Sequence, residues 1–495
     1  MSLSRDEFFA STERQGLALT FDDVRLATAQ SKVSTREVDL TSYFSRNIKL
    51  GVPLVSAAMD TVTTADMAIA MAKLGGLGVL HAGLTPEQQA KEARRVKHEL
   101  NAVIKDPITF SAELTLGDIL SECDRRQLKF RTFPITDNDG RFVGLLTQND
   151  FDFSLGNSAL AVEAAMTPAH DVVTGTPDTN MHKAFAVMRE HGKKTLPLLT
   201  EDGKVSALYV LSDVVRSLAG NPERHNLDDS GRLLVAAAVP TDEGALERIE
   251  AMGDYLDVIV VDSAQGDSYF AFQALRLIKD TYPDLDVVVG NISSSESAVA
   301  LADAGADGIK VGQGPGSICT TRIETGIGSP QVSAVYECVQ AIKGSGVPIC
   351  ADGGIVNRGD VSLAIAAGAS SVMMGGQLAG TKEAPGEVTS HNGAMVKLYR
   401  GMGSASAMRD SEASRKRYGV DSSTSTPLPE GVESYVPYKG PVDDVVNQLI
   451  MALRKSMSYV GSPDIETHRT ETRFLRVTNA GMAESRPHDV TVIQR

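Results

Sequence analysis

The segment DVIVVDS, residues 257–263, decides the fold class. Its uninterrupted apolar run is the pattern of a β-strand that is buried on both faces, as strands of parallel sheets are. A second segment of this kind, DVVVGNI, follows at residues 286–292 after an amphipathic stretch. Apolar strands that alternate with amphipathic helices predict βα units and a parallel sheet.

Further segments of the same kind lie on both sides of these two. They are VPLVSAA from Val52, LGVLH ending at His81, RLLVAAAV from Arg232, ADGIKVG from Ala306, VPICADGG from Val347 and SSVMMGG from Ser371. Eight units in all predict an α/β protein with a closed (β/α)8 TIM barrel, whose chemistry lies at the carboxyl ends of the strands. An open doubly wound sheet is the alternative. It is disfavoured because no GxGxxG with a downstream acidic residue follows the first strand.

One gap between strands is far longer than a single crossover requires, and it contains an internal repeat. FPITDNDGRFVGLLTQND (residues 133–150) parallels LPLLTEDGKVSALYVLSD (residues 196–213). Each copy reads as strand, Asp-Gly turn, strand and helix start, after an amphipathic helix. We therefore expect an inserted domain at 104–221, with the barrel divided between 1–103 and 222–495.

Composition limits the possible functions. The chain has 495 residues and a net charge of -15, which argues against a nucleic-acid partner because no basic field compensates it. The four cysteines show no paired spacing, so neither a disulfide framework nor a zinc site is indicated. No apolar run is long enough for a membrane helix, and no targeting signal is evident. We expect a cytoplasmic protein with no membrane partner.

The loop GQGPGSICTTR, residues 312–322, holds the strongest candidate nucleophile, Cys319. A lone cysteine is more often an inert core residue. Here it is flanked by hydroxyl side chains at a strand end, and glycines before it let backbone amides converge on an anion. Further glycine turns follow the next two strands, at residues 352–354 and 375–376. Because loops after strands seven and eight of barrels often bind phosphate, a phosphorylated ligand is favoured.

The ordered motifs resemble the IMP dehydrogenase / GMP reductase family, and the resemblance covers nearly the whole chain. The motifs are LTFDDV, SAAMDTVT, GQGPGSICTTR, ADGGIVNRGD, MGGQLAGTKEAPGE, YRGMGS, PEGVESYVPYKG and AESRPHDV. The tandem repeat is similar to the CBS modules that this family carries as an insertion. Many motifs in one order make a chance match implausible, although each alone is weak.

The resemblance implies NAD-dependent oxidation of IMP to xanthosine 5'-monophosphate (XMP), the committed step of guanine nucleotide synthesis. Cys319 would form a covalent thioimidate that water hydrolyses. Catalytic roles are implied for Cys319, Thr321, Arg417, Tyr418 and Glu430, the last in a mobile flap at 409–433. Substrate contacts are implied for Ser56, Ser317, Asp352, Gly353, Gly354, Gly375, Gly376, Tyr399, Met402, Gly403 and Glu430. Cofactor contacts are implied for Asp262, Ser263, Asn291, Gly312 and Gly314.

The resemblance also implies a potassium ion, an oligomer and regulation by purine nucleotides. The ion would be held by Gly314, Gly316 and Cys319, and by Glu484, Ser485 and Arg486 of a neighbouring subunit. A site shared between subunits implies a homotetramer, with a stacked octamer as an alternative. In the repeat, Asp150 and Asp213 would contact purine nucleotides, or each would only cap the following helix.

Several residues depart from the family pattern, and two other functions stay open. The departures are Gln313, Lys416 in place of the usual Asp, Gly419 with Val420, and Ser434. The first alternative is a GMP reductase with CBS modules, which would convert GMP to IMP with NADPH. Arg417-Tyr418 favours the dehydrogenase, because reductases carry a different flap. The second is a non-catalytic nucleotide sensor, which would lack the nucleophile or the flap pair.

Overall fold

The computed structural model describes residues 3–100, 103–128, 130–154, 156–218, 222–419 and 428–490. The chain divides into two units, one formed by Met1–His98 with Glu223–Arg495 and the other by Glu99–Pro222. Val420, one of the departures noted above, and part of the expected flap lie outside the described residues. No helix within the described ranges is long and apolar enough to cross a bilayer.

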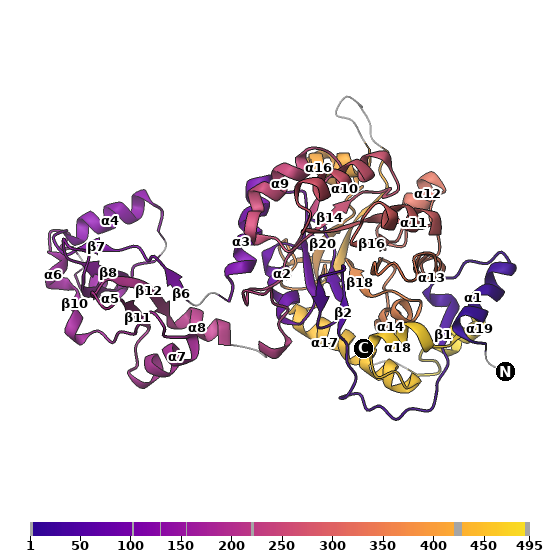
Figure 1. Cartoon of the computed structure of the whole chain (residues 1–495), viewed down its shortest axis with the longest axis horizontal. Helices are drawn as coiled ribbons and strands as arrows, with labels where there is room; N and C mark the ends of the chain where they lie inside the picture. Colours follow the sequence, from indigo (N-terminus) through magenta and orange to yellow (C-terminus); the bar gives the residue numbers. More distant parts are fainter. Residues whose placement is uncertain are drawn as a thin grey trace. The chain divides into compact units, whose positions relative to one another are not determined.

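The first unit contains a closed barrel of parallel strands, which confirms the predicted fold (Figure 1). Chain order and barrel order agree, because β5 pairs with β13 and β18 closes onto β4. Every residue of the central strands is buried, which is why their sequences are uniformly apolar. The strands are β4 (Leu54–Ser56), β5 (Leu77–Leu80), β13 (Ala236–Val239), β14 (Val258–Asp262), β15 (Asp286–Ile292), β16 (Gly308–Val311), β17 (Ile349–Asp352) and β18 (Ser371–Met374).

The third barrel strand is shorter than the sequence pattern predicts. It begins at Ala236, whereas the apolar run begins near Arg232. The Asp228 carboxylate accepts hydrogen bonds from the amides of Ser230 and Arg232, both at 2.9 Å. These bonds fold the start of the run into a turn, as Asp commonly does.

Helices cover the outside of the barrel (Figure 1). Their apolar faces pack on the strands, and helix α10 shows the pattern clearly, with Ala271, Ala274, Leu275 and Ile278 buried. The outer helices are α2 (Ala65–Lys73), α3 (Pro86–His98), α9 (Gly244–Met252), α10 (Tyr269–Thr281), α11 (Ser295–Asp303), α13 (Gln331–Ala341), α14 (Arg358–Ala366) and α17 (Val442–Val460).

Additional elements extend the barrel. A three-stranded antiparallel sheet joins β19, β20 and β21, and the short helices α15 and α16 lie between β20 and β21 in the chain. The strand near the N-terminus, β1, pairs with β22 near the C-terminus. These elements are α1 (Arg5–Arg14), β1 (Val24–Leu26), β2 (Ser42–Tyr43), β3 (Lys49–Leu50), α12 (Thr321–Thr325), β19 (Thr389–His391), β20 (Ala394–Arg400), α15 (Ala405–Asp410), α16 (Glu412–Arg417), β21 (Glu433–Pro437), α18 (Ile465–Glu471), β22 (Phe474–Arg476) and α19 (Asn479–Glu484).

In the second unit, both copies of the repeat fold as helix, hairpin and helix. Gly140 (φ 75°) and Gly203 (φ 79°) supply the left-handed backbone that each Asp-Gly turn needs. The elements are β6 (Val103–Lys105), β7 (Phe110–Ser111), α4 (Leu116–Arg125), β8 (Phe133–Thr136), β9 (Phe142–Leu146), α5 (Gln148–Phe153), α6 (Val162–Ala165), β10 (Thr167–Pro168), α7 (Met181–Glu190), β11 (Thr195–Leu199), β12 (Val205–Val210) and α8 (Leu211–Leu218).

The two copies contact each other through their hairpins. The Phe142 amide donates to the Gly203 carbonyl at 2.9 Å, and Arg141 forms a backbone bridge with Lys204. Each copy also has its own apolar cluster, centred on Phe133 in the first and on Leu196 in the second. The unit is thus a pair of similar modules joined at equivalent turns.

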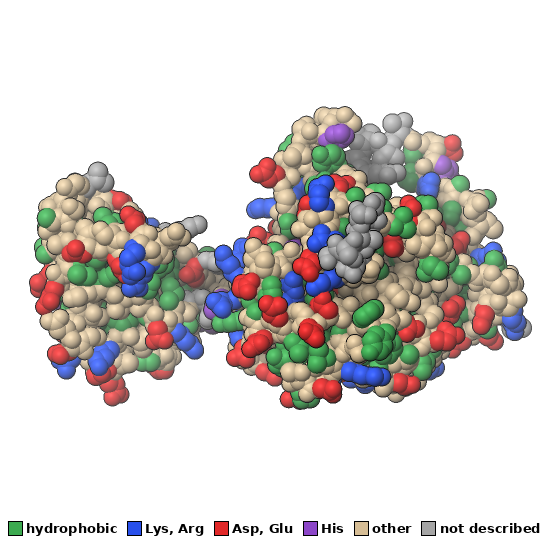
Figure 2. Space-filling view, turned by 90° about the horizontal axis from the view of Figure 1, so that it is seen from above, with side chains coloured by type: hydrophobic (Ala, Val, Ile, Leu, Met, Phe, Trp, Pro, Cys, Tyr) green, Lys and Arg blue, Asp and Glu red, His purple; other side chains and the backbone are tan. Residues whose placement is uncertain are grey.

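Charged side chains of both signs are dispersed over the visible surface. Figure 2 shows Lys and Arg interspersed with Asp and Glu on this face. The basic residues there do not form the continuous field that binds a nucleic-acid backbone.

Candidate functional site

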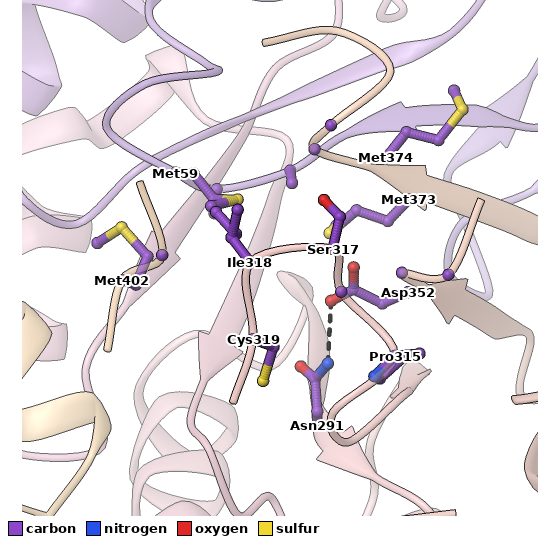
Figure 3. A pocket seen from close by; sticks show the side chains of 18 of the residues that line it. Met59, Asn291, Pro315, Ser317, Ile318, Cys319, Asp352, Met373, Met374 and Met402 are labelled. Carbon is purple, nitrogen blue, oxygen red and sulfur yellow. Dashed lines mark hydrogen bonds between the residues drawn. The ribbon is translucent and has the colours of Figure 1, made fainter. Parts of the chain in front are cut away.

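One cavity at the carboxyl ends of the barrel strands contains Cys319 (Figure 3). The space measures about 1000 Å³, part of it open to solvent, and pockets for small ligands commonly measure about 300 to 1,000 Å³. Predicted site residues that line it are Asp262, Asn291, Gly316, Ser317, Cys319, Asp352, Gly353, Gly354, Gly375, Gly376, Tyr399, Met402, Arg417, Tyr418 and Glu430.

The nucleophile loop is held in place by its own backbone and by the segment around Glu430. The Cys319 sulfur lies 3.1 Å from the Thr321 hydroxyl, and the Cys319 amide donates to the Gly316 carbonyl at 3.1 Å. The Thr320 amide donates to the Glu430 carbonyl at 2.9 Å. A cysteine fixed at a cavity wall with a hydroxyl beside it is suited to attack a bound ligand.

The remaining cysteines are fully buried, unlike Cys319. Burial raises the pKa of both Cys338 and Cys350 to about 12. Because the thiolate is the reactive form, these two thiols are inert near neutral pH.

The glycine turns after β17 and β18 meet the loop before Cys319. A Cβ atom added to Gly376 would lie 3.1 Å from the Ser317 hydroxyl, and one added to Gly375 would lie 2.6 Å from the Tyr399 hydroxyl. Burial raises the pKa of Tyr399, so its hydroxyl stays protonated and can donate. Small residues, backbone amides and two hydroxyl groups at one point form a suitable cradle for a phosphate.

Lys310, in the middle of β16, lies at the floor of the cavity and was not predicted from the sequence. Its Nζ lies 3.2 Å from Asp262 Oδ1 and 2.7 Å from Asp352 Oδ2, and it also contacts the Asn291 side-chain oxygen. Asn291 Nδ2 in turn donates to Asp352 Oδ2 at 2.9 Å (Figure 3). A lysine inside the otherwise apolar strand ADGIKVG was the signal that could have found it, because a fully buried lysine requires a partner.

The flap helix α16 reaches the same cavity through its last residue, Arg417. The guanidinium forms an ion pair with Asp262, and the Ala264 amide donates to the Arg417 carbonyl at 3.1 Å. Arg417 Nε is buried and has no hydrogen-bond partner among the described residues. Burial lowers the pKa of Arg417, and burial raises the pKa of the adjacent Tyr418. One cavity is lined by Arg417, Tyr418 and Cys319. A polar reactant such as water, bound between them, can accept a hydrogen bond from Arg417 Nε.

Five predicted contacts lie behind the cavity wall. Ser56, at the end of β4, accepts a hydrogen bond from the Thr63 hydroxyl at 2.9 Å. Gly403 packs against the Tyr418 ring, since an added Cβ would lie 2.5 Å from Tyr418 Cζ. The Gly312 carbonyl accepts a hydrogen bond from Asn291 Nδ2 at 2.7 Å. The Ser263 amide donates to the Gly290 carbonyl at 2.8 Å, and Gly314 packs against the Arg322 side chain.

The residues predicted for the ion lie in two places of this single chain. Gly314, Gly316 and Cys319 belong to the nucleophile loop. Ser485 and Arg486 lie instead beside Asp22 and Arg25, next to α19. A set completed by a second subunit therefore stays a prediction.

The predicted regulatory aspartates are in the inserted unit. Asp150 Oδ2 accepts hydrogen bonds from the Thr147 amide (2.6 Å) and hydroxyl (2.8 Å), which caps α5. Asp213 lies in the first turn of α8. The capping interpretation of Asp150 has direct support, and nucleotide binding stays a prediction.

Comparison with known proteins gives a consistent result. Residues 18–488 match the family described as "IMP dehydrogenase / GMP reductase domain". An inosine-5'-monophosphate dehydrogenase from Pasteurella multocida is 41% identical over 96% of this chain and 96% of its own length. The enzyme of the same name from Bacillus subtilis is 39% identical, also over 96% of each chain. A crystal structure of a GMP reductase variant from Trypanosoma brucei, in complex with guanosine 5'-monophosphate, aligns with a TM-score of 0.83 and 38% identity. It covers 97% of this chain and 100% of that one.

Proposed function

Because the chain belongs to the IMP dehydrogenase / GMP reductase family, we propose that it oxidises IMP to XMP with NAD+ and water. Several curated IMP dehydrogenases are about 40% identical to it along nearly its whole length, so the chain is an NAD-dependent oxidoreductase. The observation that carries the specific reaction is the shared cavity of Cys319, Arg417 and Tyr418. A nucleophile and a water-binding pair are what a two-step oxidation and hydrolysis require.

In the first step, the Cys319 sulfur adds to C2 of the purine. The phosphate lies in the turns formed by Ser317, Gly375, Gly376 and Tyr399, and Asp352 accepts hydrogen bonds from the ribose. The hydride that leaves C2 would be taken up by NAD+, which the residues around Asp262 and Asn291 would hold, and Cys319 keeps the purine as a thioimidate. Lys310 holds Asp262 and Asp352 in place beneath the reacting ring.

In the second step, water attacks C2 and displaces the sulfur. Arg417 and Tyr418 hold this water, and burial lowers the pKa of Arg417, which favours the neutral guanidine that can accept a proton from the water. Thr321 lies 3.1 Å from the sulfur and helps to position the water. The sum is IMP + NAD+ + H2O giving XMP + NADH + H+, and it returns Cys319 to the free thiol.

The nucleophile loop also fits a monovalent cation. Gly314 adopts a left-handed backbone (φ 79°), and a Cβ there would lie 2.5 Å from Arg322 Cγ, so any other residue at this position would strain the loop. Backbone carbonyls of Gly314, Gly316 and Cys319 are hard oxygen donors, as a potassium ion prefers. We propose that the loop binds this ion and that residues 484–486 of a partner subunit complete its coordination. A site shared in this way implies a homotetramer or a stacked octamer. When bound, the ion would fix the loop that carries Cys319.

The inserted unit is proposed to be a CBS pair that binds purine nucleotides. Two similar modules joined through equivalent Asp-Gly turns support this assignment. We expect a chain in which residues 99–222 are replaced by a short linker to keep its basal NADH formation, because the barrel elements all lie outside this range. Loss of all activity in a folded deletion variant would contradict a purely regulatory role.

GMP reductase is the second candidate, favoured by the structural similarity to the Trypanosoma brucei enzyme. One assay separates the two. Purified protein is mixed with IMP, NAD+ and potassium, and NADH and XMP are followed. A parallel reaction contains GMP and NADPH. Formation of NADH from IMP supports the dehydrogenase. Consumption of NADPH with GMP, without any NADH formed from IMP, would show that the protein is a reductase instead.

The covalent step is tested with Cys319→Ala. We expect no turnover and unchanged IMP binding, because the phosphate and ribose contacts come from other residues. Cys350→Ala, at a buried cysteine behind the site, is the matched control and keeps its activity. Turnover by the Cys319 variant would rule out covalent catalysis.

A further inference from the structure

Helix α16 carries two cations on adjacent residues that reach different parts of the barrel rim. Arg417 enters the cavity at Asp262, which ends β14. Lys416 extends instead to the loop after β13, where its Nζ lies 2.6 Å from Asp242 Oδ2. The same Nζ lies 3.0 Å from Glu412 Oε1, one turn earlier on α16. The helix is therefore fixed at two neighbouring strand ends.

Asp242 is oriented to receive the lysine. Its other oxygen, Oδ1, accepts a hydrogen bond from the Gly244 amide at 3.0 Å, at the first residue of α9. That bond holds the carboxylate in one rotamer, so Oδ2 faces Lys416 without a further loss of side-chain freedom. The hydrogen bond to Asp242 raises the pKa of Lys416, as expected for a charged pair.

The local charges make the identity of residue 416 important. Asp242 and Glu412 both face it, and Arg248 also lies near both carboxylates, so Lys416 is one of two cations that balance them. An aspartate at this position would instead place three carboxylates together, and their repulsion would weaken the attachment of α16 to the rim. Lys416 is thus a departure that fits the local charges of this chain.

We propose that Lys416 is a positioning residue, and that its ion pair with Asp242 holds α16 on the rim so that Arg417 and Tyr418 occupy the cavity. Because Lys416 lies outside the cavity lining, it touches no reactant and acts through its neighbour. The inference rests on the proposed function. The Lys416–Asp242 ion pair acts in the water step, which needs Arg417 and Tyr418. The hydride step, which needs Cys319, does not depend on this ion pair.

The pair is about 40% exposed on each side, and exposed ion pairs contribute only about 0.2–1 kcal/mol. Lys416→Met should therefore lower steady-state turnover by about twofold to fivefold. Lys416→Asp adds repulsion and should lower it by about tenfold. The first turnover should stay fast in both variants, so a burst of NADH equal to the number of active sites precedes the slow phase. Lys416→Asp with Asp242→Lys should restore most of the rate, because the cation and the carboxylates then face each other again.

Arg95→Met provides the matched control, because Arg95 forms an exposed ion pair with Asp66 on the outer helices α3 and α2. It should leave both phases unchanged. A second readout does not depend on the reaction, namely the rate of chymotrypsin cleavage after Tyr418, which is partly buried and lines the cavity. We expect about twofold to tenfold faster cleavage in the Lys416 variants and wild-type cleavage in the charge-swapped protein.

The outcomes separate the two proposals. Wild-type steady-state rates and wild-type cleavage in Lys416→Asp would overturn the positioning role. A burst that is lost together with the slow phase would also overturn it, because Lys416 would then affect the hydride step. If the wild-type protein forms no NADH from IMP, the proposed function fails, and the cleavage rates still decide whether the pair holds the flap.

Discussion

Replacing Lys310 by Met removes the cation at the floor of the cavity. Asp262 would keep its ion pair with Arg417, but Asp352 would keep only the 2.9 Å hydrogen bond from Asn291. The lysine side chain is 2% exposed, and removing one partner of a buried ion pair costs about 3–5 kcal/mol. We expect barrel unfolding in urea to lose this amount of free energy.

The same change should also affect catalysis, because both aspartates line the cavity and Asp352 is the proposed ribose contact. An Asp352 carboxylate without a cation beside it would turn toward water, and the ribose contact would weaken. We expect kcat/KM for IMP to fall about 100-fold, which corresponds to about 2.7 kcal/mol, with a rise in KM. Initial rates of NADH formation over a range of IMP concentrations measure this.

Lys97→Met is the control for stability alone. Lys97 is also buried between two aspartates, with Nζ 2.8 Å from Asp228 Oδ2 and 2.6 Å from Asp257 Oδ2. This pair precedes β14 and so lies at the opposite end of the barrel from the cavity. Its loss should lower stability to a similar extent and leave kcat/KM unchanged. Equal kinetics in the two folded variants would refute the assignment of Lys310 to the site.

Three further predictions test the flap, the phosphate turn and the pH dependence. Gly403→Ala places a Cβ 2.5 Å from Tyr418 Cζ and so displaces the Tyr418 ring. The variant should keep the NADH burst and lose steady-state turnover by about tenfold or more. An equal loss of both phases would contradict this. Gly375→Ala places a Cβ 2.6 Å from the Tyr399 hydroxyl and should raise the Kd for IMP about tenfold in calorimetry, whereas unchanged binding would remove this turn from the phosphate site. Burial lowers the pKa of His468 from 6.5 to about 4, so only the unfolded chain takes up a proton as pH falls through this window. His468 alone should contribute up to about 3 kcal/mol to the fall in the free energy of unfolding from pH 6.5 to 4, and urea titrations of His468→Asn should show a fall smaller by this amount.

The sequence by itself determined the barrel and placed Cys319 at the carboxyl ends of its strands. Uniform apolar runs such as residues 258–261 report burial on both faces, and burial on both faces requires helices on a parallel sheet. The glycine turns after β17 and β18 could be placed on one rim because the carboxyl ends of parallel strands share an edge. These features are local in the chain, so periodicity and turn chemistry were enough to predict them.

Only the tertiary structure decided which polar groups meet. Lys310 reaches Asp262 and Asp352, 48 and 42 residues away, because barrel closure sets β14, β15, β16 and β17 side by side. Lys416 finds Asp242 only after α16 folds back over the rim, and the sequence marked it merely as a departure. Periodicity reports the burial of a side chain, but a contact between distant residues depends on the register of strands and the path of loops. The sequence therefore predicted many of the residues that line this cavity, and the fold determined which of their charges meet.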